Sequence, residues 1–211
     1  MDPEIASPTA SEALARAGWE ALQERLIAGF CHDVNGRLAA LHGLVFLVET
    51  GEPIPPGFDK EVERLEGVVH RMVELTGNIE AAPAPMGLVA LLDRALHLHG
   101  GVKDLDGGSI EPRVEGDLPA VLVNERFSVR LLLLFVDAAW RAMDGPSRTL
   151  VLSGTKDSVE IAFHADGSRV PAGLFEALAD AAAIEGGRVY VEDERHALEL
   201  PSLSRSRAQG R

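Results

Sequence analysis

The residues of this chain that are best suited to chemistry are His32 and Asp33, a histidine followed directly by an acidic residue. Apolar residues around them recur every three or four positions, which predicts an amphipathic helix with one buried stripe: Leu22, Leu26, Phe30, Val34, Leu38, Leu41, Val45 and Val48. At about 100° per residue, His32 lies roughly 200° from both Phe30 and Val34, so we expect its imidazole to face solvent. An exposed imidazole beside a carboxylate is suited to nucleophilic or acid–base chemistry.

The helix face around His32 is made mostly of small residues. Those within one or two turns on the same face are Arg25, Ala28, Gly29, Asn35, Gly36 and Ala39, with Gly43 one turn further on. Because a helical glycine costs about 1 kcal/mol relative to alanine, glycines spaced by seven need an explanation. One explanation is that a partner's backbone approaches the imidazole; the alternatives are close helix packing and a composition rich in Ala and Gly. The docking explanation takes these residues as its candidates: Arg25, Gly29, Asn35, Gly36, Arg37 and Ala39.

Composition limits the classes of partner. The chain has 211 residues, of which 46% are hydrophobic and 25% charged, enough for a sizeable core in one or two domains. A formal net charge of −13 argues against non-specific binding to nucleic acid or anionic membranes, so we expect protein partners. The single cysteine, Cys31, excludes an internal disulfide, and we find no leader peptide and no apolar run of the ~20 residues that span a bilayer. These features predict a cytoplasmic protein.

Two long helices are predicted in the first part of the chain. One is capped by Ser11 and runs from about residue 11 to 49, before the turn-rich residues 51–57, and the second covers about residues 59–80. Two helices with one apolar stripe each cannot bury both stripes well as an isolated antiparallel hairpin. Pairing two hairpins across a two-fold axis gives a four-helix bundle, so we expect a homodimer.

The rest of the chain is predicted to be a two-layer α+β sandwich. Two prolines in residues 81–85 indicate a linker. Beyond it, helical patterns cover residues 87–99, 124–143 and 172–183, and strand patterns cover 109–116, 121–123, 148–153, 158–164, 188–192 and 197–200. We therefore divide the chain into a helical hairpin (residues 11–80), an α/β sandwich (residues 86–201) and a flexible tail (residues 202–211).

Several segments resemble, in order, the motifs of sensor histidine kinases. Phe30-Cys31-His32-Asp33 resembles the H-box, which holds the phospho-accepting histidine of that family. Residues 86–99 resemble the first helix of its ATP-binding domain, 118–139 the N-box helix, 159–171 the strand and G1 turn, and 186–201 the terminal strands. The resemblance covers roughly residues 20 to 201, and it implies a dimeric hairpin followed by a histidine-kinase ATPase-like α/β sandwich.

The same registers depart from the family where it binds ATP. The N-box asparagine positions hold Asp137 and Leu133, and we expect Asp137 to be a helix-surface or capping carboxylate. In the G1 register, the aspartate position is Ala165 and the second glycine position is Arg169. Residues 172–185 leave no room for a nucleotide lid, and no second Gly-x-Gly turn is present to cradle phosphates. The departures predict a degenerate domain that keeps the fold without binding ATP.

A phospho-accepting histidine without a working kinase domain resembles a histidine phosphotransferase, the relay intermediate of two-component signalling. The resemblance implies that neutral His32 accepts a phosphoryl group from the receiver domain of a response regulator or hybrid kinase and passes it to another receiver. Asp33 would orient the ring or take its proton. The chain would need no cofactor of its own, because the receiver brings magnesium.

Three other interpretations stay open from the sequence. A pseudokinase-like dimer could bind and inhibit or scaffold two-component proteins without being phosphorylated. An active histidine kinase would require a nucleotide site that the sequence lacks. His32 could also be an ordinary surface histidine.

Overall fold

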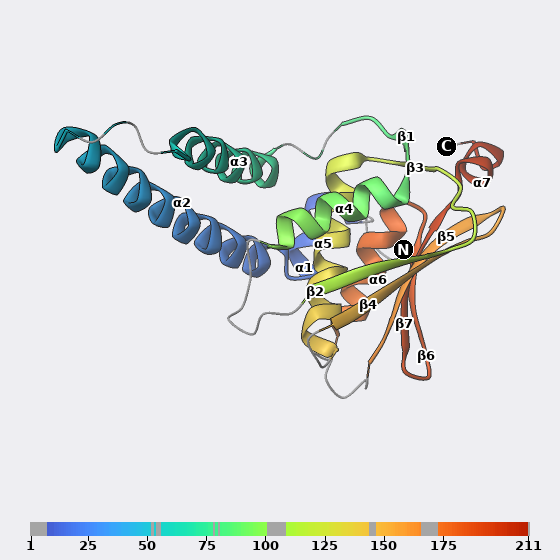
Figure 1. The fold of residues 1–211 in the computed structure, drawn as a ribbon. Coiled ribbons are helices and arrows are strands. Elements are labelled where there is room, and N and C mark those ends of the chain that lie inside the picture. The colour runs from blue at the N-terminus through green and yellow to red at the C-terminus, as the bar shows by residue number, and fades with distance from the viewer. Residues whose placement is uncertain are drawn as a thin grey trace.

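The computed structural model describes residues 8–51, 53, 56–77, 79, 81–100, 109–143, 147–165 and 173–210. Two long antiparallel helices, α2 (Trp19–Glu49) and α3 (Phe58–Thr76), project as a hairpin from a layer of helices packed on a sheet (Figure 1). No helix in the described ranges is both long enough and apolar enough to cross a membrane.

The first predicted helix is divided in two. A short helix α1 (Ala10–Arg16) is capped by Thr9, not Ser11, and it ends before Gly18, whose φ of +88° lies in the left-handed region. Glycine adopts this conformation without the steric cost of a Cβ, so the chain can turn there. The turn lets α1 pack against α6 (Leu174–Ile184) while α2 continues into the hairpin.

The sheet confirms the α+β class. Its five strands have the order β2 (Ser109–Glu115), β4 (Ser147–Gly154), β5 (Ser158–His164), β7 (Arg195–Pro201) and β6 (Arg188–Glu192). Strand β2 pairs parallel to β4, and the other pairs are antiparallel. Three helices, α4 (Leu88–His99), α5 (Glu125–Ala142) and α6, cover one face of the sheet (Figure 1).

Two elements differ from the sequence analysis. Part of the expected linker forms a strand, β1 (Ala84–Met86), which pairs antiparallel with β3 (Val121–Val123). The expected flexible tail contains helix α7 (Leu203–Ala208), whose first turn is capped by the Ser202 hydroxyl. The Ser202 hydroxyl also donates to the Lys156 carbonyl at 2.7 Å, which ties this end of the chain to the β4–β5 turn.

The hydrophobic core extends from the sheet layer into the base of the hairpin. Leu22, Leu26 and Phe30 of α2 are at most 1% exposed and belong to the same core cluster as the apolar side of α5. Further along the same stripe, Leu38, Val45 and Val48 are 40–43% exposed. The sheet layer therefore buries the first half of the α2 stripe, and the described part of the chain leaves the second half partly exposed.

Candidate functional site

His32 lies midway along α2, and its side chain is exposed, as its position off the apolar stripe predicts. Asp33 is turned toward the other helix of the hairpin, where Oδ2 lies 3.8 Å from Nη2 of Arg71. The Arg71 guanidinium also lies over the Phe30 ring, 5.3 Å from its centroid. Among the described residues, no hydrogen bond joins the His32 ring to Asp33, so the ion pair between α2 and α3 is the contact that positions this carboxylate.

The small face beside His32 is open. A Cβ built on Gly36 or Gly43 would meet nothing within 4 Å, and the neighbouring Asn35 and Ala39 are exposed, whereas Gly29 is half-buried. Close packing inside one chain therefore does not explain Gly36 or Gly43. The face on which His32 stands can be approached closely from solvent.

Two of the predicted docking residues are bonded within the chain. Arg37 donates to Glu61 of α3 at 3.3 Å and so helps to hold the hairpin together. Arg25 donates to Asp137 of α5 at 2.7 Å and joins the base of α2 to the sheet layer. These two guanidinium groups have structural partners, whereas the side chains of Asn35 and Ala39 make no hydrogen bond or ion pair with the described residues.

Asp137 is buried, and its expected position on the helix surface is wrong. Its side chain is 1% exposed and lies among basic side chains from three helices. Arg25 reaches it from α2, Arg141 bonds it from the next turn of α5, and Nε2 of His99 lies 3.6 Å from Oδ1. The N-terminal helices cover this part of α5, a burial that depends on packing between distant segments.

The environment of Asp137 keeps it charged. Burial alone would raise its pKa, but the nearby His99 and Arg25, together with the charge of Arg141, hold the pKa below its ordinary value. The carboxylate is therefore ionised at neutral pH. It joins α2, α4 and α5 through charge-assisted contacts.

The other positions that align with ATP-binding motifs are also occupied by residues that pack inside the chain. Leu133 is fully buried, and Ala165 is 8% exposed, with its carbonyl 3.1 Å from Nε2 of His196. A Cβ on Gly187 would lie 2.5 Å from the Glu199 carbonyl oxygen, so this glycine serves close packing of the chain. Arg169 and Pro171 lie outside the described residues. Within the described ranges, no three His, Cys, Asp or Glu side chains gather as a metal site would require.

Comparisons with known proteins find likeness among solved structures alone. No family model matches the chain, and no curated protein matches it. The Acinetobacter baumannii histidine kinase AdeS aligns with a TM-score of 0.46 and 13% identity, over 81% of this chain and 96% of that one. Histidine kinase ThkA, solved in complex with the response regulator protein TrrA, aligns with a TM-score of 0.46 and 14% identity, over 89% of this chain and 64% of that one.

The ATP-binding domain of PrrB from Mycobacterium tuberculosis aligns with a TM-score of 0.43 and 22% identity, over 58% of this chain and 98% of that one. Likenesses of this size carry no argument about activity. The function must be inferred from the residues of this chain.

Proposed function

We propose that this chain is a histidine phosphotransferase, in which His32 receives a phosphoryl group from one receiver domain and passes it to another without ATP. The observation that carries the proposal is an exposed His32 on an open helix face. The buried Asp137 supports the claim that transfer proceeds without ATP. Its carboxylate oxygens already face Arg25, Arg141 and His99 and so do not face a site for a magnesium ion.

The transfer would proceed by nucleophilic attack of a neutral imidazole on the acyl phosphate of a receiver aspartate. A nitrogen–phosphorus bond forms as the acyl phosphate P–O bond breaks, and the receiver aspartate leaves as a carboxylate. Asp33 is half exposed and pairs with Arg71, so the proton that the imidazole loses would reach this carboxylate through water and not through a direct hydrogen bond. The reverse step transfers the group to a second receiver, and magnesium comes with the receiver.

This proposal is tested by phosphotransfer from receiver domains loaded with a small-molecule phosphodonor. The native chain should remove the phosphoryl group from its cognate receiver, and His32→Ala should abolish this loss. His42→Ala is the matched control, because His42 is also exposed on α2, and it should transfer normally. Tight receiver binding without transfer in the native chain would favour the scaffold alternative.

We predict that the chain does not bind ATP at millimolar nucleotide. In the N-box register, Oδ2 of the Asp137 carboxylate is already bonded by Arg25 and Arg141, and Ala165 has no side-chain group for the adenine. Calorimetric titration with magnesium and ATP should give no heat of binding. Magnesium-dependent affinity would overturn the prediction and support the kinase interpretation.

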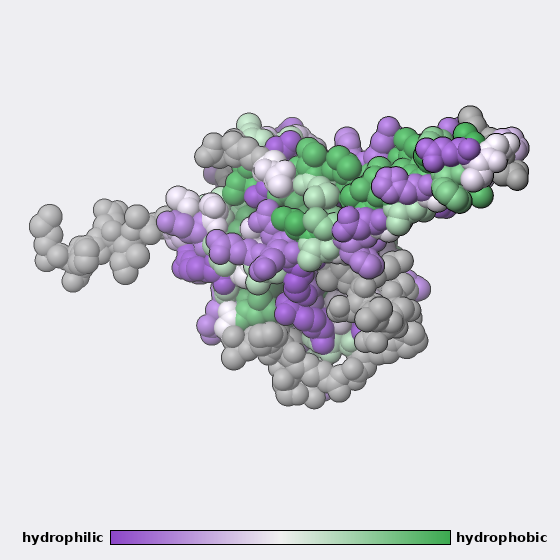
Figure 2. All heavy atoms as spheres, turned by 90° about the vertical axis from the view of Figure 1, so that its left-hand side faces the viewer, coloured by the Kyte–Doolittle hydropathy of each residue, from purple (hydrophilic) through white to green (hydrophobic). Residues whose placement is uncertain are grey.

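The exposed half of the hairpin supports a homodimer. Leu38 and Val45 of α2 and Val69 and Val73 of α3 are 40–63% exposed, and an apolar groove of about 510 Å³ lies between the two helices. Figure 2 shows hydrophobic residues gathered among hydrophilic ones on the side from which the hairpin projects. A contiguous apolar surface of this kind marks an interaction site. The second copy of the hairpin is the occupant that we propose.

We predict that light scattering gives a dimer mass at micromolar concentration. Val73→Glu places a charge at a position that is 63% exposed in one chain, so it should leave the protomer folded while dissociating the dimer. Val114→Glu is the matched control, because Val114 is 49% exposed on β2, away from the hairpin. A monomer mass for the native chain would contradict the dimer.

A further inference from the structure

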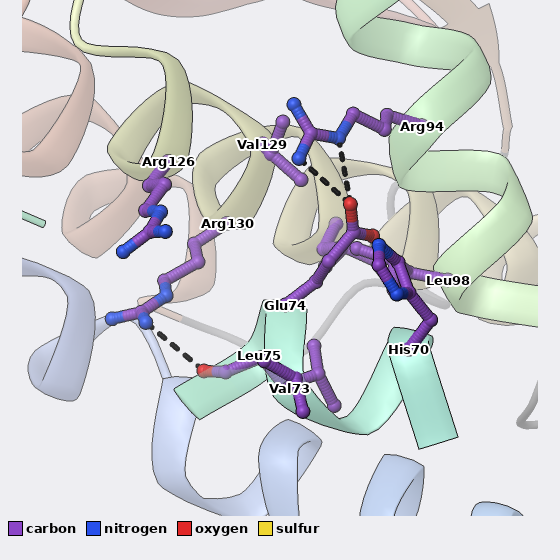
Figure 3. Close-up of a pocket in the computed structure, with 10 residues that line it drawn as sticks. His70, Val73, Glu74, Leu75, Arg94, Leu98, Arg126, Val129 and Arg130 are labelled. Carbon is purple, nitrogen blue, oxygen red and sulfur yellow. Dashed lines mark hydrogen bonds and ion pairs between the residues drawn. The ribbon is translucent and has the colours of Figure 1, made fainter. Parts of the chain in front are cut away.

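A pocket of about 190 Å³ lies where the hairpin meets the sheet layer (Figure 3). The last turns of α3 form one wall, and α4 and α5 form the other. Its floor is apolar, because the buried Leu98, Val129 and Leu133 line it. A small molecule in this pocket would touch both parts of the protein.

The rim of the pocket is rich in guanidinium groups. Arg94 donates from Nε and Nη2 to one oxygen of Glu74, at 3.1 and 2.7 Å, and it also bonds Glu125. Arg130 donates to the main-chain carbonyls of Leu75, at 2.9 Å, and of Gly77. Thus the rim carboxylate Glu74 is already committed to a cation.

Arg130 is held by groups without a full negative charge, and its guanidinium lies over the Trp19 ring, 5.1 Å from the ring centroid. It is partly buried, Arg126 lies one turn away on α5, and both effects hold its pKa below its ordinary value. In the described ranges its hydrogen bonds go to carbonyl oxygens, which carry no full negative charge. Arg126 itself lies close against the chain, since a Cβ on Gly77 would be 2.5 Å from its Nη1.

The composition of the pocket selects one class of ligand. A cation would be repelled by the arginines of the rim, and a wholly apolar molecule would strip water from Arg130 without replacing its hydrogen bonds. An oxyanion with a short apolar body satisfies both the rim and the floor. We propose that this pocket binds a small organic oxyanion, a phosphate monoester or a carboxylate, independently of any phosphotransfer at His32.

The test uses the full chain with phenyl phosphate and benzoate as probes. Phenol serves as the neutral control, inorganic phosphate as the head group alone, and sodium chloride as the match for ionic strength. A ligand that binds only the folded chain raises Tm. We therefore expect one of the two organic anions, added at ten times its own Kd, to raise Tm by about 3–6 °C. Phenol should not change Tm. The organic anion that gives the larger rise in Tm shows whether the pocket prefers a phosphate or a carboxylate head group.

Two variants and a control locate the binding. Arg126→Gln removes a rim charge and Val129→Phe fills the floor, so each should weaken calorimetric affinity for the effective probe at least tenfold. Arg113→Gln is the control, because Arg113 is exposed on β2, and this variant should bind the effective probe with native affinity. Absence of a shift with both probes would overturn the proposal. So would native affinity in Arg126→Gln, which decides the question if Val129→Phe does not fold.

Discussion

Asp137→Ala is expected to lower the free energy of unfolding by about 3 kcal/mol, which corresponds to a fall in Tm of about 6–12 °C. The substitution removes a carboxylate that is 1% exposed and leaves Arg25 and Arg141 without their shared partner. The expected cost lies at the lower end of the range for a broken buried pair, because Arg25 and Arg141 are 40% and 46% exposed and keep access to water. Thermal and denaturant unfolding of the two proteins would measure it.

Asp180→Ala is the matched control for this substitution. Its carboxylate pairs with Arg16 at 3.2 Å, but both side chains are about half exposed, so its removal should cost less than about 1 kcal/mol. Equal losses in the two variants would contradict the account of Asp137 as the group that fastens α2 to the sheet layer.

The same carboxylate predicts a pH dependence. The folded-state pKa of Asp137 lies below its ordinary value, so its stabilising contribution is fully present above the unfolded pKa of about 3.9. The contribution is lost as the pH falls through the folded-state value. The difference in unfolding free energy between native chain and Asp137→Ala should therefore be constant near neutral pH and shrink below about pH 4.

Gly36→Leu is expected to reduce phosphotransfer at least tenfold while leaving the fold intact or more stable. The new side chain would stand one turn from His32 on the face that a receiver must approach. A Cβ at this position would meet nothing within 4 Å, and replacing glycine improves helix propensity by up to about 1 kcal/mol. A transfer rate and a thermal midpoint, measured with the same receiver and protein, separate the two effects.

Gly36→Ala is the control at the same position, because it gains helix propensity without bulk. It should keep most of the transfer rate and show a similar rise in stability. Unchanged transfer in a well-folded Gly36→Leu protein would mean that this face is not where the receiver docks. A weaker dimer would instead assign Gly36 to packing between copies.

Elements with strong local signals could be predicted from the sequence. Helix α5 lies within a residue of its expected bounds because Asn124 caps it, its side chain accepting from the Phe127 amide, and a long apolar run follows. The turn residues between the two strands predict the β4–β5 hairpin equally well. The exposure of His32 followed from helical periodicity alone.

Features that depend on distant partners could not be predicted in the same way. Strand β1 needs β3 beside it, and α1 separates from α2 because it packs on α6. Asp137 and Arg25 are 112 positions apart, so their ion pair has no local pattern. One signal was nevertheless present, since Asp137 is the sole charged residue between Leu131 and Ala139 and its burial could have been inferred.

The most direct test of the phosphotransferase proposal is to locate the phosphoryl group after the chain meets a phosphorylated receiver. Mass spectrometry of the alkaline-quenched native chain, with acid lability checked in parallel, should place one acid-labile phosphoryl group on the imidazole of His32. The same treatment of His32→Ala should leave the chain unmodified. A phosphoryl group on another residue, or none on the native chain while its receivers exchange phosphate with a second histidine protein, would contradict the account.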